Sequence, residues 1–191
     1  MSLSAEEFYK QFYCRFQELV KQNRGKYDKT KSDPEWTSYV KDGFLKNLGE
    51  ELGYSVHTEQ VFGVDLLFQK KSEQDSIAVE HENDPKGIWK KEIPNLLKTA
   101  ASLKVLITYV NDTEFPGKEI ADKLYDELKE KDFKEEFLPI LGAFSMKEPS
   151  DWVGYFYHRE LSCQTLTTCS NMLEAEKNPA HKAWNKRKIP K

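Results

Sequence analysis

Two stretches near the N-terminus place apolar residues at helical spacing. The first follows Ser4-Ala5-Glu6-Glu7, which has the form of a capping box, and it predicts an amphipathic helix to about residue 21. The second follows Ser32-Asp33-Pro34-Glu35, a helix start signal with proline in the first turn. It continues to Glu51 or Leu52, and Gly53 is placed to end it. The N-terminal quarter is therefore expected to be helical.

The pattern then changes to the short period of β-strands. Residues 54–58, 61–69 and 77–82 are rich in β-forming residues and predict three strands, with Gly63 as a candidate bulge. Residues 86–103 predict a helix that kinks or starts late, because Pro94 lies within it. The apolar run 104–110 predicts a buried strand.

The order from residue 33 to 110 is therefore helix, three strands, helix and strand. Short links make the first three strands antiparallel, and the crossing helix requires a parallel return. This order predicts an α/β fold with a mixed central sheet flanked by helices. The N-terminal helix precedes it, and the expected C-terminal additions are a helix at 116–131, strands at 137–144 and 152–158, and a short helix near 165–174.

Composition fits one compact domain spanning residues 1–191. Eleven Phe, nine Tyr and four Trp supply enough apolar area for a core. No apolar run approaches the roughly 20 residues needed to cross a bilayer, so we expect no membrane partner. Three cysteines without CxxC spacing, and the absence of a secretory pattern, favour a reducing, cytoplasmic location.

The net charge of −3 hides two basic clusters. Residues 21–31 contain five cations, and the tail 178–191 contains five cations and no acid. Such clusters can meet phosphate groups; the alternative is a solvated loop and a solvated tail. The candidate nucleic-acid-binding residues are Lys26, Lys186, Arg187 and Lys188.

Three acids form the candidate site. Asp65 lies alone in an apolar run, where an unpaired charge is costly. Glu80 and Glu82 lie on one face of the third strand, with His81 on the other face. If the second and third strands form a hairpin, Asp65 and Glu80 converge, and Glu50 or Glu51 can complete the cluster.

Carboxylate oxygens in such a group suit Mg²⁺ or Mn²⁺, and the candidate metal ligands are Asp65, Glu80 and Glu51. A lysine nearby would orient water and offset phosphate charge. On a regular helix, Lys90 shares a face with Ile93 and Leu97 and turns toward the sheet, whereas Lys91 points elsewhere.

Plainer interpretations remain open for these residues. Asp65 could pair with a lysine such as Lys70, and Glu80 and Glu82 could form a solvated strand end. His81 is expected to be packed or hydrogen-bonded, and Asn83 to cap a turn. Lys90 and Lys91 could be ordinary surface lysines.

The order of elements and acids resembles the PD-(D/E)xK, or restriction-endonuclease-like, nuclease superfamily. Its core is αβββαβ, and residues 33–110 match that order. Gly63-Val64-Asp65 stands where the PD element would be, and Glu80-His81-Glu82 stands where E-x-K would be. Val64 replaces the proline, and Glu82 replaces the lysine; some members use E-x-E, and others carry the lysine on the following helix.

The resemblance implies Mg²⁺-dependent hydrolysis of phosphodiester bonds in DNA. Asp65, Glu80, Glu82 and Lys90 are then the expected catalytic residues, with Lys91 as an alternative to Lys90. The second interpretation is a catalytically decayed module of the same fold that binds nucleic acid or protein. The elements after residue 110 are expected to serve dimerisation or substrate choice, so this interpretation allows a homodimer.

Overall fold

The computed structural model describes residues 3–22, 37–58, 63–70, 75–84, 86–110, 117–143, 152–158 and 161–166. The expected helix start at residues 32–35 lies outside these ranges. So do the four candidate nucleic-acid-binding residues, Lys26, Lys186, Arg187 and Lys188.

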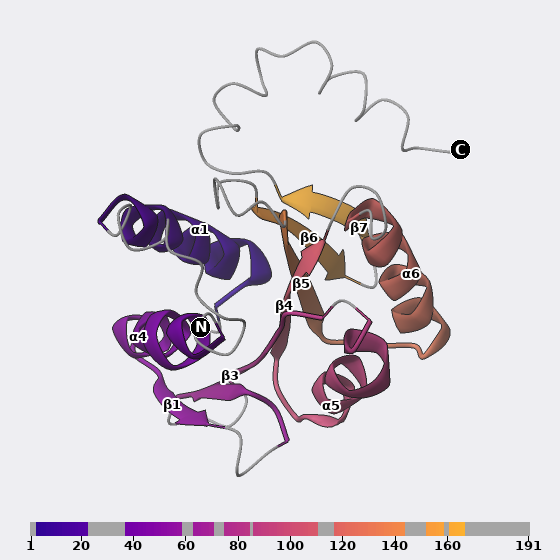
Figure 1. Ribbon diagram of the computed structural model, residues 1–191. Coiled ribbons are helices and arrows are strands. Elements are labelled where there is room, and N and C mark those ends of the chain that lie inside the picture. Colours follow the sequence, from indigo (N-terminus) through magenta and orange to yellow (C-terminus); the bar gives the residue numbers. More distant parts are fainter. Residues whose placement is uncertain are drawn as a thin grey trace.

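A seven-stranded mixed sheet runs through the centre of the described residues (Figure 1), and its strands follow sequence order from β1 to β7. The strands are β1 (Ser55–Thr58), β2 (Leu66–Gln69), β3 (Ser76–Glu82), β4 (Leu103–Val110), β5 (Glu136–Ala143), β6 (Trp152–His158) and β7 (Leu161–Leu166). Strands β1, β2 and β3 pair antiparallel. Strand β4 is parallel to both β3 and β5, and β6 and β7 pair antiparallel. The predicted mixed sheet with a parallel return at β4 is therefore confirmed.

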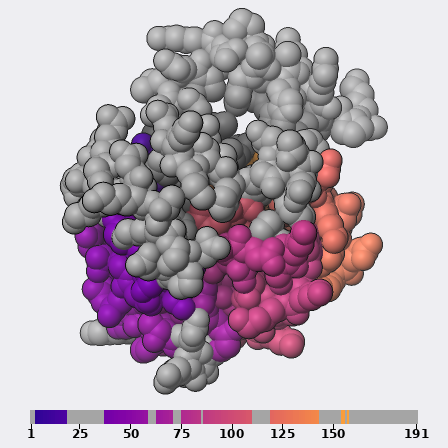
Figure 2. Space-filling view, in the orientation of Figure 1, coloured from indigo at the N-terminus to yellow at the C-terminus, as the bar shows by residue number. Residues whose placement is uncertain are grey.

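Helices cover both faces of this sheet (Figure 1). One layer contains α1 (Ala5–Gln22), the π-helical segment η1 (Tyr39–Leu45) and α4 (Lys46–Glu51), and the other contains η2 (Ile88–Glu92, also π-helical), α5 (Ile93–Lys98) and α6 (Gly117–Glu130). In the space-filling view of Figure 2, the purple η1–α4 region and the magenta η2–α5 region, which cover opposite faces of the sheet, appear next to each other in the lower half of the view.

Two buried clusters hold the layers to the sheet. The first cluster includes Phe8, Phe12, Phe16, Phe44, Leu48, Leu66, Phe68, Ile77, Val79 and Val105. The second cluster includes Ile88, Ile93, Leu96, Leu67, Ala78, Leu106, Ile120, Leu124, Leu128 and Leu141. Successive residues of β3 alternate between the two, as the pleat requires. Each face of β3 is consequently buried against a different helical layer.

Several local predictions are confirmed. Ser4 and Glu7 form the reciprocal hydrogen bonds of a capping box at the start of α1. Gly53 has a φ of +80°, the left-handed conformation that ends α4. Pro94 lies in the first turn of α5, which follows η2 without a break, so the chain changes there from π-helical to α-helical turns and the expected kink or late start stays a prediction.

Two predictions differ from the structure. The strand expected at 61–69 begins only at Leu66 in the described residues, because residues 63–65 form a bend in which Gly63 has a φ of +72°. Thr165 and Leu166, expected to begin a short helix, belong to β7, which completes the sheet beside β6. Cross-strand pairing there outweighs the weak helical pattern.

None of the described helices is long and apolar enough to span a bilayer.

Candidate functional site

The hairpin of β2 and β3 brings Asp65 and Glu80 together. Its last paired residues are Leu66 and Val79, so Asp65 and Glu80 stand one position beyond, at the end of the ladder. The backbone N–H of Asp65 donates to Oε2 of Glu80 at 3.2 Å. Oδ2 of Asp65 in turn accepts from the backbone N–H of His81 at 2.9 Å. At the end of the β2–β3 ladder, side-chain carboxylates thus accept the backbone N–H hydrogen bonds that backbone carbonyls accept within it.

Glu80 is the most perturbed group of this site. It is 2% exposed, and its Oε1 atom is buried without a hydrogen-bond partner. Burial, followed by the nearby charges of Asp65 and Glu92, raises the pKa of Glu80 to about 9. Without a cation, Glu80 therefore holds a proton at neutral pH.

Glu92 is a member of this acidic group that the sequence pattern did not single out. It lies at the end of η2, it is 4% exposed, and its charge contributes to the raised pKa of Glu80. Its neighbours Ile88, Ile93 and Leu96 are all buried. A single acid among the apolar positions of a helix is the same signal that identified Asp65, and it could have identified Glu92.

Lysines approach the acids from both helical layers. From η1, Nζ of Lys41 lies 3.5 Å from Oδ1 of Asp65, and both side chains are about 15% exposed. From η2, Nζ of Lys91 lies 3.3 Å from Oε1 of Glu92, and Lys91 is largely exposed. Glu92, Glu80 and Asp65 together raise the pKa of Lys91. Lys70 instead pairs with Asp75.

The orientation expected for Lys90 is wrong. Lys90 is exposed, and the buried positions of this helical pair are Ile88, Glu92, Ile93 and Leu96. The expectation assumed a regular α-helix, whereas residues 88–92 form π-helical turns, which move each side chain around the axis. Lys91 is the lysine of this helix that contacts an acid.

Glu51 and Glu82 have partners other than the acidic group of Asp65, Glu80 and Glu92. Glu51 forms an ion pair with Arg15 of α1. Oε1 of Glu82 accepts from the backbone N–H of Asp84 at 2.9 Å, so this carboxylate caps the turn after β3. The metal-binding role of Glu51 and the catalytic role of Glu82 remain predictions.

His81 lies on the opposite face of β3, as alternation predicts. It is buried, and its Nε2 atom lies 3.1 Å from the hydroxyl of Tyr109. Burial first, and then the charge of Lys41, lower the pKa of His81 to about 4. His81 is therefore a neutral, packed residue at physiological pH.

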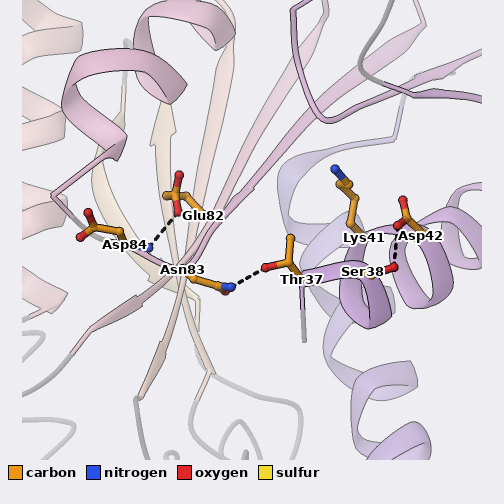
Figure 3. A pocket seen from close by; sticks show the side chains of 7 residues that line it. All are labelled: Thr37, Ser38, Lys41, Asp42, Glu82, Asn83 and Asp84. Carbon is orange, nitrogen blue, oxygen red and sulfur yellow. Dashed lines mark hydrogen bonds between the residues drawn. The ribbon is translucent and has the colours of Figure 1, made fainter. Parts of the chain in front are cut away.

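A polar groove of about 540 Å³ opens beside the acids (Figure 3). Glu82, Asn83 and Asp84 line one side of it, and Thr37, Ser38, Lys41 and Asp42 line the other. The side-chain amide of Asn83 donates to the hydroxyl of Thr37 and joins the two sides. Lys41 belongs to both the groove and the acidic group.

The acidic group presents carboxylate oxygens, the donor type that Mg²⁺ prefers in proteins. Among the described residues, no group of three or more His, Cys, Asp or Glu side chains is arranged to hold a metal ion. Mg²⁺, however, is usually held by one or two carboxylates, with water and substrate phosphates completing its shell. Glu80 offers one such oxygen in its unpartnered Oε1, and the oxygens of the neighbouring Asp65 contact Lys41 and the backbone N–H of His81.

Comparisons with protein-family models, with curated proteins and with solved structures returned no match.

Proposed function

We propose that this protein is a metal-dependent nuclease that hydrolyses phosphodiester bonds in DNA. The observation that carries the proposal is the buried Glu80 carboxyl group, with one oxygen unpartnered, beside Asp65 and Glu92. Carboxylates have only acceptor atoms when ionised. Neighbouring buried carboxylates therefore need either a shared proton or a shared cation between them.

Of these two alternatives, a shared cation would give the site a catalytic function. Asp65 and Glu80 would hold Mg²⁺ or Mn²⁺, with Glu92 close enough to influence the site. The ion, when bound, would stabilise the charge that develops on the phosphate and favour ionisation of an attacking water. In the net reaction, water adds to phosphorus, the bond to one sugar oxygen breaks, and that oxygen gains a proton.

The residues of the chain would position and neutralise the substrate. The ammonium group of Lys41 lies beside Asp65, where it can offset the negative charge of a phosphate, whereas Lys91 is paired with Glu92 at the surface. The N–H of His81 fixes Oδ2 of Asp65, so this carboxylate is held in place by the strand end instead of by a mobile loop. Glu82 would influence the site through the adjacent turn.

The order of strands supports the proposed restriction-endonuclease-like core. An antiparallel β1–β2–β3 meander, a helical crossing and a parallel β4 are the arrangement that the resemblance implies for αβββαβ. Asp65, one residue before β2, and Glu80, near the end of β3, support this proposal because the resemblance expects its motif acids on the second and third strands. The departure is Glu82, which stands where the motif lysine would be.

Cleavage of supercoiled plasmid and of single-stranded DNA in Mg²⁺, Mn²⁺ or EDTA tests the proposal. We expect cleavage in either metal, none in EDTA, and a loss on the order of 100-fold or more in Asp65→Asn and Glu80→Gln. Glu130→Gln is the matched control, because Glu130 is an exposed acid on α6. Cleavage that persists in both site variants would disprove the assignment of Asp65 and Glu80 to the active site.

One observation favours a non-catalytic module of the same fold. Lys41 already provides Asp65 with a positive partner, so the acids can be a structural network stabilised by lysines and a proton. Titration with Mn²⁺ separates the two functions. No Mn²⁺ binding and no cleavage by the wild-type protein would favour the module and exclude the nuclease.

A further inference from the structure

The groove beside the acids contains one cation among its described lining residues. Asp42, Glu82 and Asp84 are acidic, Thr37, Ser38 and Asn83 are neutral, and Lys41 carries the positive charge. Figure 3 shows the side chains of Lys41 and Asp42 on one side of the groove and that of Glu82 on the other. A phosphate entering this groove is repelled everywhere except near Lys41.

Lys41 is held in an unusual place for a lysine. Its side chain is only 16% exposed, although lysines are rarely buried without a reason. Its Nζ atom is 3.5 Å from Oδ1 of Asp65, at the long end of a hydrogen bond. Lys41 thus contacts the acidic group at Asp65 and also lines the groove.

The other lysines near the acids are worse placed to act within the groove. Lys91 contacts Glu92 in the opposite helical layer, and its side chain is 75% exposed. Lys90 is exposed on the same helix. Neither is among the residues that line the groove.

We propose that the groove between η1 and the turn after β3 receives the DNA strand, and that Lys41 is the catalytic lysine that contacts the scissile phosphate. This inference rests on the proposed nuclease function. Lys41 would supply, from the helical segment ahead of the sheet, the positive charge that Glu82 cannot supply at the end of β3. The three groove acids would keep other phosphates out and accept hydrogen bonds from sugar or base groups.

The test compares Lys41→Met and Lys41→Arg with Lys90→Met and Lys91→Met. Methionine keeps much of the apolar stem, and arginine keeps the charge. For each variant, kcat and KM are measured on a DNA duplex in Mg²⁺, Mn²⁺ affinity is measured without DNA, and thermal unfolding checks the fold.

We expect Lys41→Met to lower kcat on the order of 100-fold, as loss of one group that stabilises transition-state charge does. Lys41→Arg should recover kcat to within about tenfold of wild type, with KM changed by less than about threefold in both variants. Mn²⁺ affinity should stay equal or become tighter, because a cation beside Asp65 has been removed. The Lys90 and Lys91 variants should keep kcat within about threefold of wild type.

Three results would overturn the assignment of Lys41 while leaving the nuclease function standing. They are wild-type kcat in Lys41→Met, a large decrease of kcat in Lys91→Met instead, and failure of both Lys41 variants to bind Mn²⁺, which would make Lys41 a structural partner of Asp65. A wild-type protein that cleaves no DNA in either metal fails the proposed function itself, and the inference with it.

Discussion

Glu80 is a residue whose ionisation conflicts with its surroundings. The end of β3 buries it, and the hairpin register and η2 give it two acidic neighbours. The folded protein resolves the conflict with a proton when no cation is present. Because that proton is linked to folding, the pH dependence of stability reports on this site directly.

In EDTA, the free energy of unfolding should fall as the pH rises from 6.5 to 9. The folded pKa of Glu80 is about 9 and its ordinary value is 4.5, so across this interval the folded state keeps a proton that the unfolded chain has lost. His81 acts in the opposite direction, but only between its folded pKa of about 4 and its ordinary value of 6.5. Above pH 6.5, the pH dependence of the free energy of unfolding therefore reflects Glu80 and not His81.

Urea denaturation of wild type, Glu80→Gln and Glu130→Gln at several pH values measures this effect. The contribution of Glu80 is at most about 1.4 kcal/mol per pH unit, and it should disappear in Glu80→Gln but persist in Glu130→Gln. Equal slopes in wild type and Glu80→Gln would show that Glu80 is ionised in the folded protein.

Sequence reasoning could predict only part of this site. Asp65 and Glu80 follow from strand alternation and a short hairpin, which fix register without knowledge of the helices. Glu92 and Lys41 come from helical segments packed on opposite faces of the sheet. Their direction depends on π-helical turns, which the usual 3.6-residue period does not reveal, and the same turns explain the wrong orientation expected for Lys90.

At the scale of elements, the fold was more predictable than the site. The order of helices and strands up to β4 follows from changes in apolar period, and Gly53 and Pro94 punctuate it as their backbone preferences require. β7 was missed because its six residues carry weak patterning, and pairing with β6 defines the strand. The bend before β2 follows from the left-handed φ of Gly63, which shortens the strand and leaves Asp65 in the bend, one residue before it.

Close packing of α4 on the sheet depends on a glycine. A Cβ at Gly49 would lie 2.6 Å from Cγ2 of Val56 and 3.0 Å from the ring of Phe68. Gly49→Ala should therefore lower the free energy of unfolding by about 1–3 kcal/mol through overpacking. Because α4 continues directly from η1, the same substitution tests whether this packing holds the helical layer that carries Lys41 in position.

Gly43→Ala is the matched control for that substitution. Gly43 belongs to the same helical layer, but a Cβ there would meet nothing within 4 Å. Its free energy of unfolding should be unchanged or higher by up to about 1 kcal/mol, since alanine restricts the unfolded chain more than glycine does. Equal destabilisation of the two variants, measured by urea denaturation, would contradict the packing argument.

On the scale of the whole molecule, the charge is divided between an acidic site and two basic segments. The chain has a net charge of −3, yet residues 178–191 contain five cations and no acid. An acidic site alone repels DNA, so a nuclease of this composition needs cations elsewhere to hold the backbone. The basic tail is the segment whose charge is least balanced by neighbouring acids in sequence.

Neutralising Lys186, Arg187 and Lys188 together as glutamines should weaken DNA binding and its salt dependence. Each lysine or arginine that no longer neutralises a phosphate reduces the slope of log affinity against log salt by about 0.9 for duplex DNA. The control replaces three exposed lysines on separate parts of the described fold, Lys46, Lys98 and Lys134, with glutamine, which removes the same charge. Fluorescence anisotropy across a salt series measures both slopes. If the slope falls equally in the two triple variants, total charge governs binding and the tail has no dedicated role; if it falls only in the tail variant, residues 186–188 bind phosphates.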